Sequence, residues 1–180
     1  MPTAPTPAAL WGPQTGLVLL RLTPLVISSA SLMFSWAQHL FFGNFVNSQL
    51  SAQPDHPAGK VLVHYMPEAM RRGVPAILAL YPSAMALAFA NSLGGYKVVH
   101  PVARRFYLAS GVLSLAHFYF VPRVKRIVAA ISAAKDPGVR NEDAMRDWLA
   151  MHTQRSLLVN FPAWLCLFVG TVLVVSEGIA

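Results

Sequence analysis

The sequence predicts an all-α integral membrane protein, a four-helix bundle with an amphipathic helical extension on the cytosolic side. The chain has 180 residues, of which 55% are hydrophobic and 12% are charged, whereas soluble domains carry roughly 25% charged residues. The mean hydropathy is +0.49. The apolar residues gather in four stretches, each near the length of about 20 residues that a helix needs to cross a bilayer.

The four predicted spans cover residues 22–45, 74–93, 101–121 and 157–175. Residues 1–16 are rich in Pro, Ala and Thr and contain no Lys or Arg, unlike the positively charged start of a secretory signal. We therefore expect a loosely ordered leader that is retained, followed by a first span that acts as a signal anchor. Because four helices cannot bury their polar faces separately, we expect one domain over residues 1–180.

The first long connection begins as a loop, because residues 47–59 contain the sequence Pro-Asp-His-Pro. His64, Glu68 and Arg72 then follow at four-residue spacing, which places them on one face of a helix. We expect this segment to extend the second span and to end near Gly73 or bend at Pro75.

The second long connection contains Asp-Pro-Gly at residues 136–138, which predicts a turn. Asn141 is a suitable N-cap for the helix that follows, and acidic residues come directly after it. That helix carries Trp148, His152 and Arg155 into the fourth span.

The net charge of +7 indicates the orientation of the protein in the membrane and contact with lipid headgroups. It does not indicate a nucleic-acid-binding surface. The two long connections hold 10 of the 14 basic residues. The positive-inside rule places them in the cytosol and both termini on the other side of the membrane. We expect the endoplasmic reticulum as the membrane if the source is eukaryotic.

Threading the four spans in alternating directions brings polar residues of all four helices to one depth near the cytosolic face. Such residues are costly in a bilayer and usually serve a task or a partner, so their convergence predicts a cavity for an apolar small molecule. The candidate substrate-binding residues are Gln38, His39, Asn47, His64, Tyr119, Arg123 and Trp148.

Four residues are candidates for catalysis. His152 is a potential general acid or base near neutral pH, and Arg155 on the same helical stripe is suited to stabilise an oxyanion. His117 is the second candidate base, and Glu68 is the acidic residue best placed to act with a histidine. Taken singly, Arg155 also fits a headgroup contact, and Glu68 an ion pair on a helix surface.

We expect no metal and no cofactor. No pair of the 6 histidines has the spacing HxxxH or ExxH, and the single cysteine, Cys166, lies within the fourth span and forms no internal disulfide. No carboxylate lies deep in a span, which argues against an ion-coupled transporter. The expected partners are the substrate and the bilayer, with a homo-oligomer left open.

Three segments resemble the anthrone oxygenase-like family of small membrane proteins. They are the end of the first span, residues 41–44 (Phe-Phe-Gly-Asn), the end of the third, residues 119–123 (Tyr-Phe-Val-Pro-Arg), and residues 148–155, which begin with Trp148 and end with Arg155. Many relatives have Asn-Pro where this chain has Val121-Pro122.

The resemblance implies a four-helix fold and a tailoring reaction in a fungal polyketide pathway. Some members oxidise anthrones to anthraquinones without a bound cofactor, and others of this size open epoxides and cyclise polyketides. By position, Trp148, His152 and Arg155 would form the active site. We therefore expect an anthrone-type oxygenase, with an epoxide hydrolase or cyclase as the alternative. A non-catalytic membrane scaffold or accessory subunit is the third interpretation.

Overall fold

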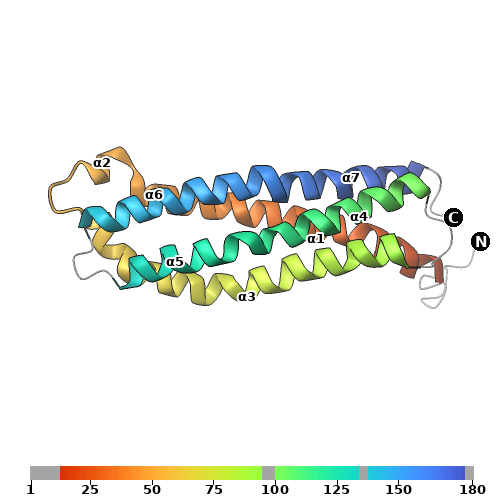
Figure 1. Ribbon diagram of the computed structural model, residues 1–180, viewed down its shortest axis with the longest axis horizontal. Helices are drawn as coiled ribbons and strands as arrows, with labels where there is room; N and C mark the ends of the chain where they lie inside the picture. Colours follow the sequence, from red (N-terminus) through yellow and green to blue (C-terminus); the bar gives the residue numbers. More distant parts are fainter. Residues whose placement is uncertain (1–12, 95–99, 134–137, 177–180) are drawn as a thin grey trace, which may run out of the picture.

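The protein is an all-α bundle of long rods that lie side by side, which confirms the predicted fold class (Figure 1). The computed structural model describes residues 13–94, 100–133 and 138–176. The described helices are α1 (Pro13–Gly43), η2 (Asn44–Val46), α2 (Ser48–Ser51), α3 (Pro57–Leu93), α4 (Pro101–Ala116), η3 (His117–Phe120), α5 (Val121–Ser132), α6 (Gly138–Arg155), η4 (Ser156–Asn160) and α7 (Phe161–Ser176).

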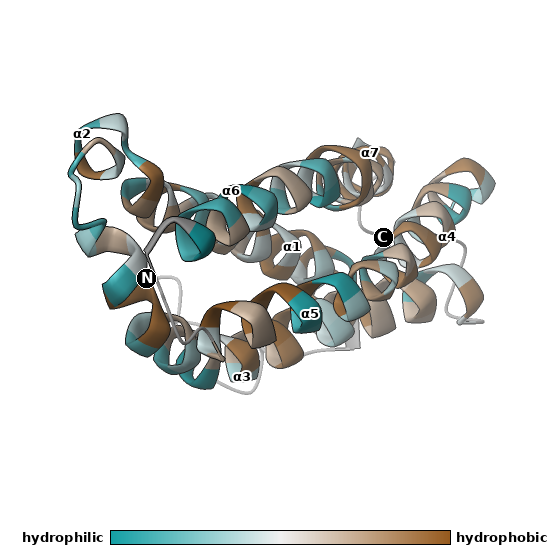
Figure 2. Ribbon diagram, turned by 60° about the vertical axis from the view of Figure 1, so that its left-hand side comes forward, coloured by the Kyte–Doolittle hydropathy of each residue, from teal (hydrophilic) through white to brown (hydrophobic). Residues whose placement is uncertain are grey.

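Four rods make up the bundle. The first two are α1 and α3, the third runs from α4 through η3 into α5, and the fourth runs from α6 through η4 into α7. The start of α1 and the end of α7 lie at one end of the bundle, and α2 lies at the other (Figure 1). Figure 2 shows hydrophilic residues on α2 and α6 and hydrophobic ones on α7.

Three helical segments are long and apolar enough to cross a membrane: Thr15–Ser51, Pro57–Leu93 and Arg140–Ser176, each of 37 residues. A helix of that length spans about 55 Å at 1.5 Å per residue, against about 30 Å for the hydrocarbon core. The rods therefore extend well beyond the membrane. The third predicted span is different, because α4 has only 16 residues before the helix tightens into η3.

The helices extend beyond the predicted spans. The first helix begins at Pro13, before the predicted span of residues 22–45. The expected helix end near Gly73 is wrong, since α3 continues from Pro57 to Leu93 with Pro75 among three internal prolines, and a bend at Pro75 stays a prediction. Gly73 lies against α1, where a Cβ atom would meet the ends of the Phe34 and Gln38 side chains.

Asn141 does not cap a helix, because α6 already begins at Gly138. Its buried amide instead donates a hydrogen bond of 3.1 Å to the carbonyl of Gly59 and so ties α6 to α3. Tertiary contact has taken precedence over the local capping preference of asparagine.

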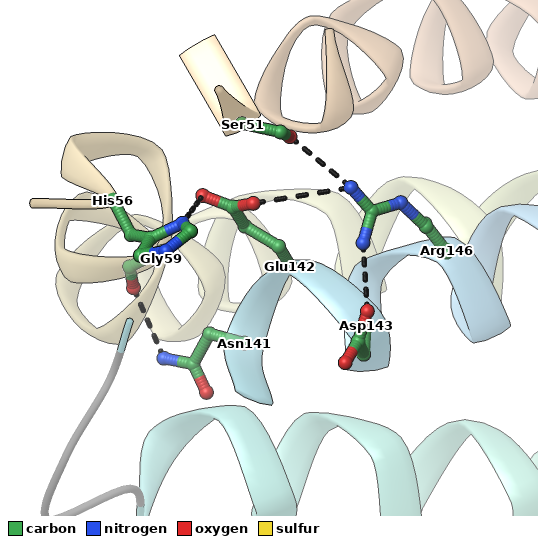
Figure 3. A network of polar contacts seen from close by, with 7 residues as sticks. All are labelled: Ser51, His56, Gly59, Asn141, Glu142, Asp143 and Arg146. Atoms are coloured by element: carbon green, nitrogen blue, oxygen red, sulfur yellow. Dashed lines mark hydrogen bonds and ion pairs between the residues drawn. The ribbon is translucent and has the colours of Figure 1, made fainter. Parts of the chain in front are cut away.

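A polar network holds the start of α6 against α2 and the connection between α2 and α3 (Figure 3). The buried carboxylate of Glu142 lies 3.4 Å from Nδ1 of His56 and 3.9 Å from Nη2 of Arg146. Arg146 also donates to Asp143 at 2.7 Å and to Ser51 at 3.1 Å. These contacts fix the direction in which α6 enters the bundle, and with it the side chains further along that helix.

Two apolar clusters stabilise the two halves of the bundle. Leu62, Met66 and Met151 belong to the cluster beside α2, and Tyr107 and Leu167 belong to the cluster at the opposite end. The residues between these clusters along each rod form a layer of buried polar side chains, which is where the candidate site lies.

Candidate active site

The centre of the site is the end of α6, where the predicted stripe of Trp148, His152 and Arg155 faces the interior. All three are buried, with 3%, 1% and 7% of their surface exposed. The Trp148 and His152 rings are stacked, with centroids 4.7 Å apart and planes 9° apart. An arginine that reaches for lipid headgroups would be exposed, so the headgroup interpretation is wrong for Arg155.

The hydrogen bonds of His152 define its tautomer. Nε2 lies 2.9 Å from the carbonyl oxygen of Ser35, and Nδ1 lies 2.6 Å from Nη2 of Arg155. A carbonyl only accepts and a guanidinium only donates, so Nε2 carries the proton and Nδ1 accepts. Both ring nitrogens are therefore engaged, and in this arrangement the imidazole orients Arg155 and keeps no lone pair free for a substrate proton.

Arg155 is a buried cation that has no acidic partner within the described part of the chain. None of its atoms makes an ion pair with a carboxylate among the described residues, and its Nε has no hydrogen-bond partner there. A buried charge that is not compensated is strongly destabilising. The guanidinium is thus prepared to receive an anionic group.

A turn of π-helix follows Arg155 directly. In η4 the amide of Phe161 bonds to the carbonyl of Ser156, five residues earlier. In an α-helix, residues five apart point in different directions, whereas the wider turn returns Asn160 toward the face that carries Arg155. Single π turns are frequent at functional sites, and this one adds a buried amide to the polar layer.

A chain of hydrogen bonds links Asn160 to the other three rods. Its Oδ1 lies 3.2 Å from Nδ1 of His117, and its Nδ2 donates to the Tyr81 hydroxyl at 3.1 Å. That hydroxyl lies 2.9 Å from Oγ of Ser35. The His117 and Tyr81 rings are in contact, with centroids 4.2 Å apart. The structure therefore brings His117 into the layer that holds His152, as the threading of the helices predicted.

Tyr81 and Asn160 belong to this layer but were not among the predicted site residues. Asn160 carries a signal that could have revealed it, because a carboxamide within the fourth predicted span is costly unless it serves a purpose. Tyr81 gives a weaker signal, since a tyrosine in a membrane helix also fits the interfacial belt.

Glu68 is not brought to this layer. It lies on α3 roughly 20 Å along the axis from Tyr81, at about 1.5 Å per residue. Its carboxylate is bound by the exposed guanidinium groups of Arg71 and Arg72. This is the surface ion pair that the sequence left open as the alternative.

Of the remaining predicted residues, some lie near the buried polar layer and others are exposed away from it. His39 lines a groove beside His152, and Gln38 is half-buried near Gly73. Four others are exposed and away from the polar layer: Asn47 caps α2 through the amide of Gln49, His64 lies on the surface of α3, and Tyr119 and Arg123 line a separate surface hollow.

The groove beside the site has a volume of about 440 Å³, within the range of small-molecule pockets. It lies between α1 and the rod formed by α6, η4 and α7. Its lining residues are Leu32, Ser35, Trp36, His39, His152, Thr153, Ser156, Leu157 and Phe161.

Across residues 13–94, 100–133 and 138–176, no three His, Cys, Asp or Glu side chains gather into a group that could hold a metal ion. That the protein needs no metal or cofactor stays a prediction.

The fold and the site define an all-α integral membrane protein with a buried arginine–histidine pair beside an apolar groove. The chain is 30% identical to "Probable epoxidase scpX" of Mollisia scopiformis over 149 residues, 82% of this chain and 91% of that protein. It is 28% identical to "Epoxidase gkaX" of Penicillium citrinum over 85% and 92% of the two chains. The identity to "Epoxidase pydX" of an Acremonium species is 29% over 82% and 89%.

The chain therefore belongs to the same family as these fungal proteins. No family model matches it, and no solved structure is detectably similar to it. The more specific resemblance to the anthrone oxygenase-like family accordingly stays a prediction.

Proposed function

We propose that this protein is a membrane-embedded enzyme that oxygenates an apolar secondary metabolite, and that the reaction is epoxidation of a carbon–carbon double bond. Its relatives are named as epoxidases and align over most of their length. The observation that carries the proposal is the buried guanidinium of Arg155, which has no carboxylate partner among the described residues.

Arg155 would act by holding negative charge on oxygen. A preorganised cation in a site that excludes water stabilises a developing oxyanion strongly, because no solvent has to reorganise. His152 keeps the guanidinium in place through the 2.6 Å hydrogen bond to Nη2, and Trp148 holds the imidazole plane by stacking. His152 is therefore a positioning residue in this proposal. Arg155 supplies the positive charge and acts from behind His152, which lines the groove.

Anthrone-type oxygenation is the second candidate, favoured by the segments around Trp148 and Arg155. An anthrone loses a proton to give an enolate, which reacts with oxygen and then loses water to leave a ketone. Arg155 would hold that enolate. Epoxidation by oxygen also inserts one oxygen atom, but two electrons and two protons from a reductant must reduce the second atom to water.

Isotope labelling separates these reactions. Membranes containing the full chain are given anthrone, or an apolar polyene with a reductant, under ¹⁸O₂. Epoxidation adds one labelled oxygen and loses no hydrogen, whereas anthrone oxidation adds one labelled oxygen and loses two hydrogens. When a polyene epoxide is supplied, an epoxide hydrolase adds one oxygen from H₂¹⁸O, whereas a cyclase gives an isomer of the epoxide that contains no label. Conversion of none of these substrates would favour the scaffold interpretation.

The matched variants are Arg155→Lys and Arg105→Lys. The first keeps the charge but removes the planar donors that meet His152, and the second makes the same change at an exposed position of α4. Loss of one oxyanion donor typically lowers turnover by about 10²–10³-fold. We expect a loss of that order for Arg155→Lys only, and equal turnover by both variants would contradict the proposal.

A further inference from the structure

The groove beside His152 has apolar walls and polar groups along its depth. Leu32, Trp36, Leu157 and Phe161 form the apolar part. Trp36, Leu157 and Phe161 have 51%, 63% and 48% of their surface exposed, and they lie on segments apolar enough to cross a membrane. The groove therefore opens toward lipid, so the molecules that reach it are those that partition into the bilayer.

Two polar side chains in the groove lack partners within the described part of the chain. The Oγ atom of Ser156 is buried and makes no hydrogen bond there. His39 is exposed, and its imidazole makes no hydrogen bond or ion pair with a described residue, although its ring lies nearly parallel to that of His152 with centroids 6.4 Å apart. A buried hydroxyl without a partner is unfavourable, so an occupant that bonds to it is favoured.

The two histidines on this groove differ in what they can do. His152 has both ring nitrogens engaged, by Ser35 and Arg155. His39 has neither ring nitrogen engaged by a described residue, so one lone pair on its imidazole is available to a substrate hydroxyl. Of the two histidines that line the groove, His39 is therefore the one that can accept a proton from a bound molecule, although the sequence suggested it only as a binding residue.

We propose, on the basis of the function proposed above, that the groove binds the apolar substrate directly from the bilayer and that His39 removes a proton from it. The substrate class is an apolar molecule with one acidic hydroxyl, a phenol or an enol. The O–H bond breaks, the proton moves to the imidazole of His39, and the electron pair stays on the substrate oxygen. Arg155 does not line the groove, but it bonds to His152, which does, so its positive charge stabilises the oxyanion from behind that side chain. No oxidant is consumed in this step.

A lipid acyl chain is the competing occupant. It would match the apolar walls but would leave Ser156 and His39 without a hydrogen-bonding partner. A hydroxylated apolar molecule matches the apolar walls and also forms hydrogen bonds with Ser156 and His39. For this reason we favour it as the occupant.

Photolabelling tests the location of the site without requiring turnover. The full chain in lipid nanodiscs is irradiated with 4-hydroxybenzophenone, an apolar phenol that inserts into nearby C–H bonds, and the adducts are mapped by peptide mass spectrometry. We expect adducts within residues 32–39 and 153–161. Thr153→Trp should fill the groove and reduce them at least fivefold, whereas Val172→Trp, the same change on the exposed face of α7, should leave them unchanged.

Equal labelling of all lipid-facing surfaces, or labelling that Thr153→Trp does not reduce, would show a groove filled by lipid and overturn the proposal. The role of His39 is tested by comparing 4-hydroxybenzophenone with benzophenone, which lacks the hydroxyl. We expect the wild-type protein to prefer the phenol and His39→Gln to lose that preference while still binding both probes. A preference that survives in His39→Gln would exclude His39 as the contact.

These measurements distinguish the two proposals. Labelling confined to the groove in a protein that oxygenates no substrate would contradict the proposed function but keep the binding site. Oxygenation that continues at full rate in Thr153→Trp and His39→Gln would contradict the groove as the substrate-binding site. The proposed oxygenase function would then still stand.

Discussion

The guanidinium Nη2 of Arg155 donates to Nδ1 of His152 across 2.6 Å, one turn apart on the same helix. Because Nε2 of His152 donates to the carbonyl of Ser35 on α1, the imidazole connects the backbone of one rod to the buried cation of another. This relationship gives His152 a role in holding Arg155 rather than in taking a proton.

Replacing His152 by Phe should therefore destabilise the fold and lower activity together. The ring can still stack on Trp148, but Arg155 loses its acceptor and remains buried. We expect the free energy of unfolding to fall by about 1–3 kcal/mol, the usual penalty for an unsatisfied buried polar group, as measured by thermal unfolding in detergent.

A second substitution provides the control. In His152→Phe/Arg155→Leu both polar partners become apolar, and removing a buried pair together is often nearly neutral. The double variant should regain part of the lost stability but none of the activity. If the double variant is less stable than His152→Phe alone, other groups accept hydrogen bonds from the guanidinium. Arg155 would then not depend on His152.

Glu68→Gln should leave turnover within about twofold of wild type. The carboxylate bonds to Arg71 and Arg72 on the surface of α3 and lies far from Tyr81. Exposed ion pairs contribute about 0–1 kcal/mol, so unfolding should change little as well. The check is oxygenation under ¹⁸O₂ at several substrate concentrations, and a loss of tenfold or more would restore Glu68 to the catalytic set.

Gly111→Ala should weaken the contact between α3 and α4. A Cβ atom at position 111 would come within 2.8 Å of the Phe89 ring, whereas one at Gly16 would meet nothing within 4 Å. Overpacking a tight contact typically destabilises by about 1–3 kcal/mol. Thermal unfolding of Gly111→Ala beside Gly16→Ala measures this, and equal stability of the two variants would mean that Phe89 moves away freely.

The topology can be tested with single cysteines in a Cys166→Ser background. Ser132, at the end of α5, lies on the side that the positive-inside rule places in the cytosol, and Leu93, at the end of α3, lies on the opposite side. In sealed microsomes a membrane-impermeant maleimide should label Ser132→Cys before permeabilisation and Leu93→Cys only after it. The reverse order would invert the proposed orientation.

The fold class and part of the site follow from local features of the sequence. Hydropathy and helix length are local properties, so the apolar segments and the all-α bundle could be predicted without knowing any contact between helices. The stripe of Trp148, His152 and Arg155 could be predicted for the same reason, because spacings of four and three residues define one face of any α-helix.

Which polar residues meet depends on how the rods pack against one another. The longitudinal register between rods places Tyr81 beside Ser35 and leaves Glu68 on the surface, and that register depends on packing between residues distant in sequence. The π turn after Arg155 directs Asn160 inward, which α-helical periodicity does not predict. The engagement of both nitrogens of His152 likewise requires a carbonyl from α1, and no spacing within α6 reveals it.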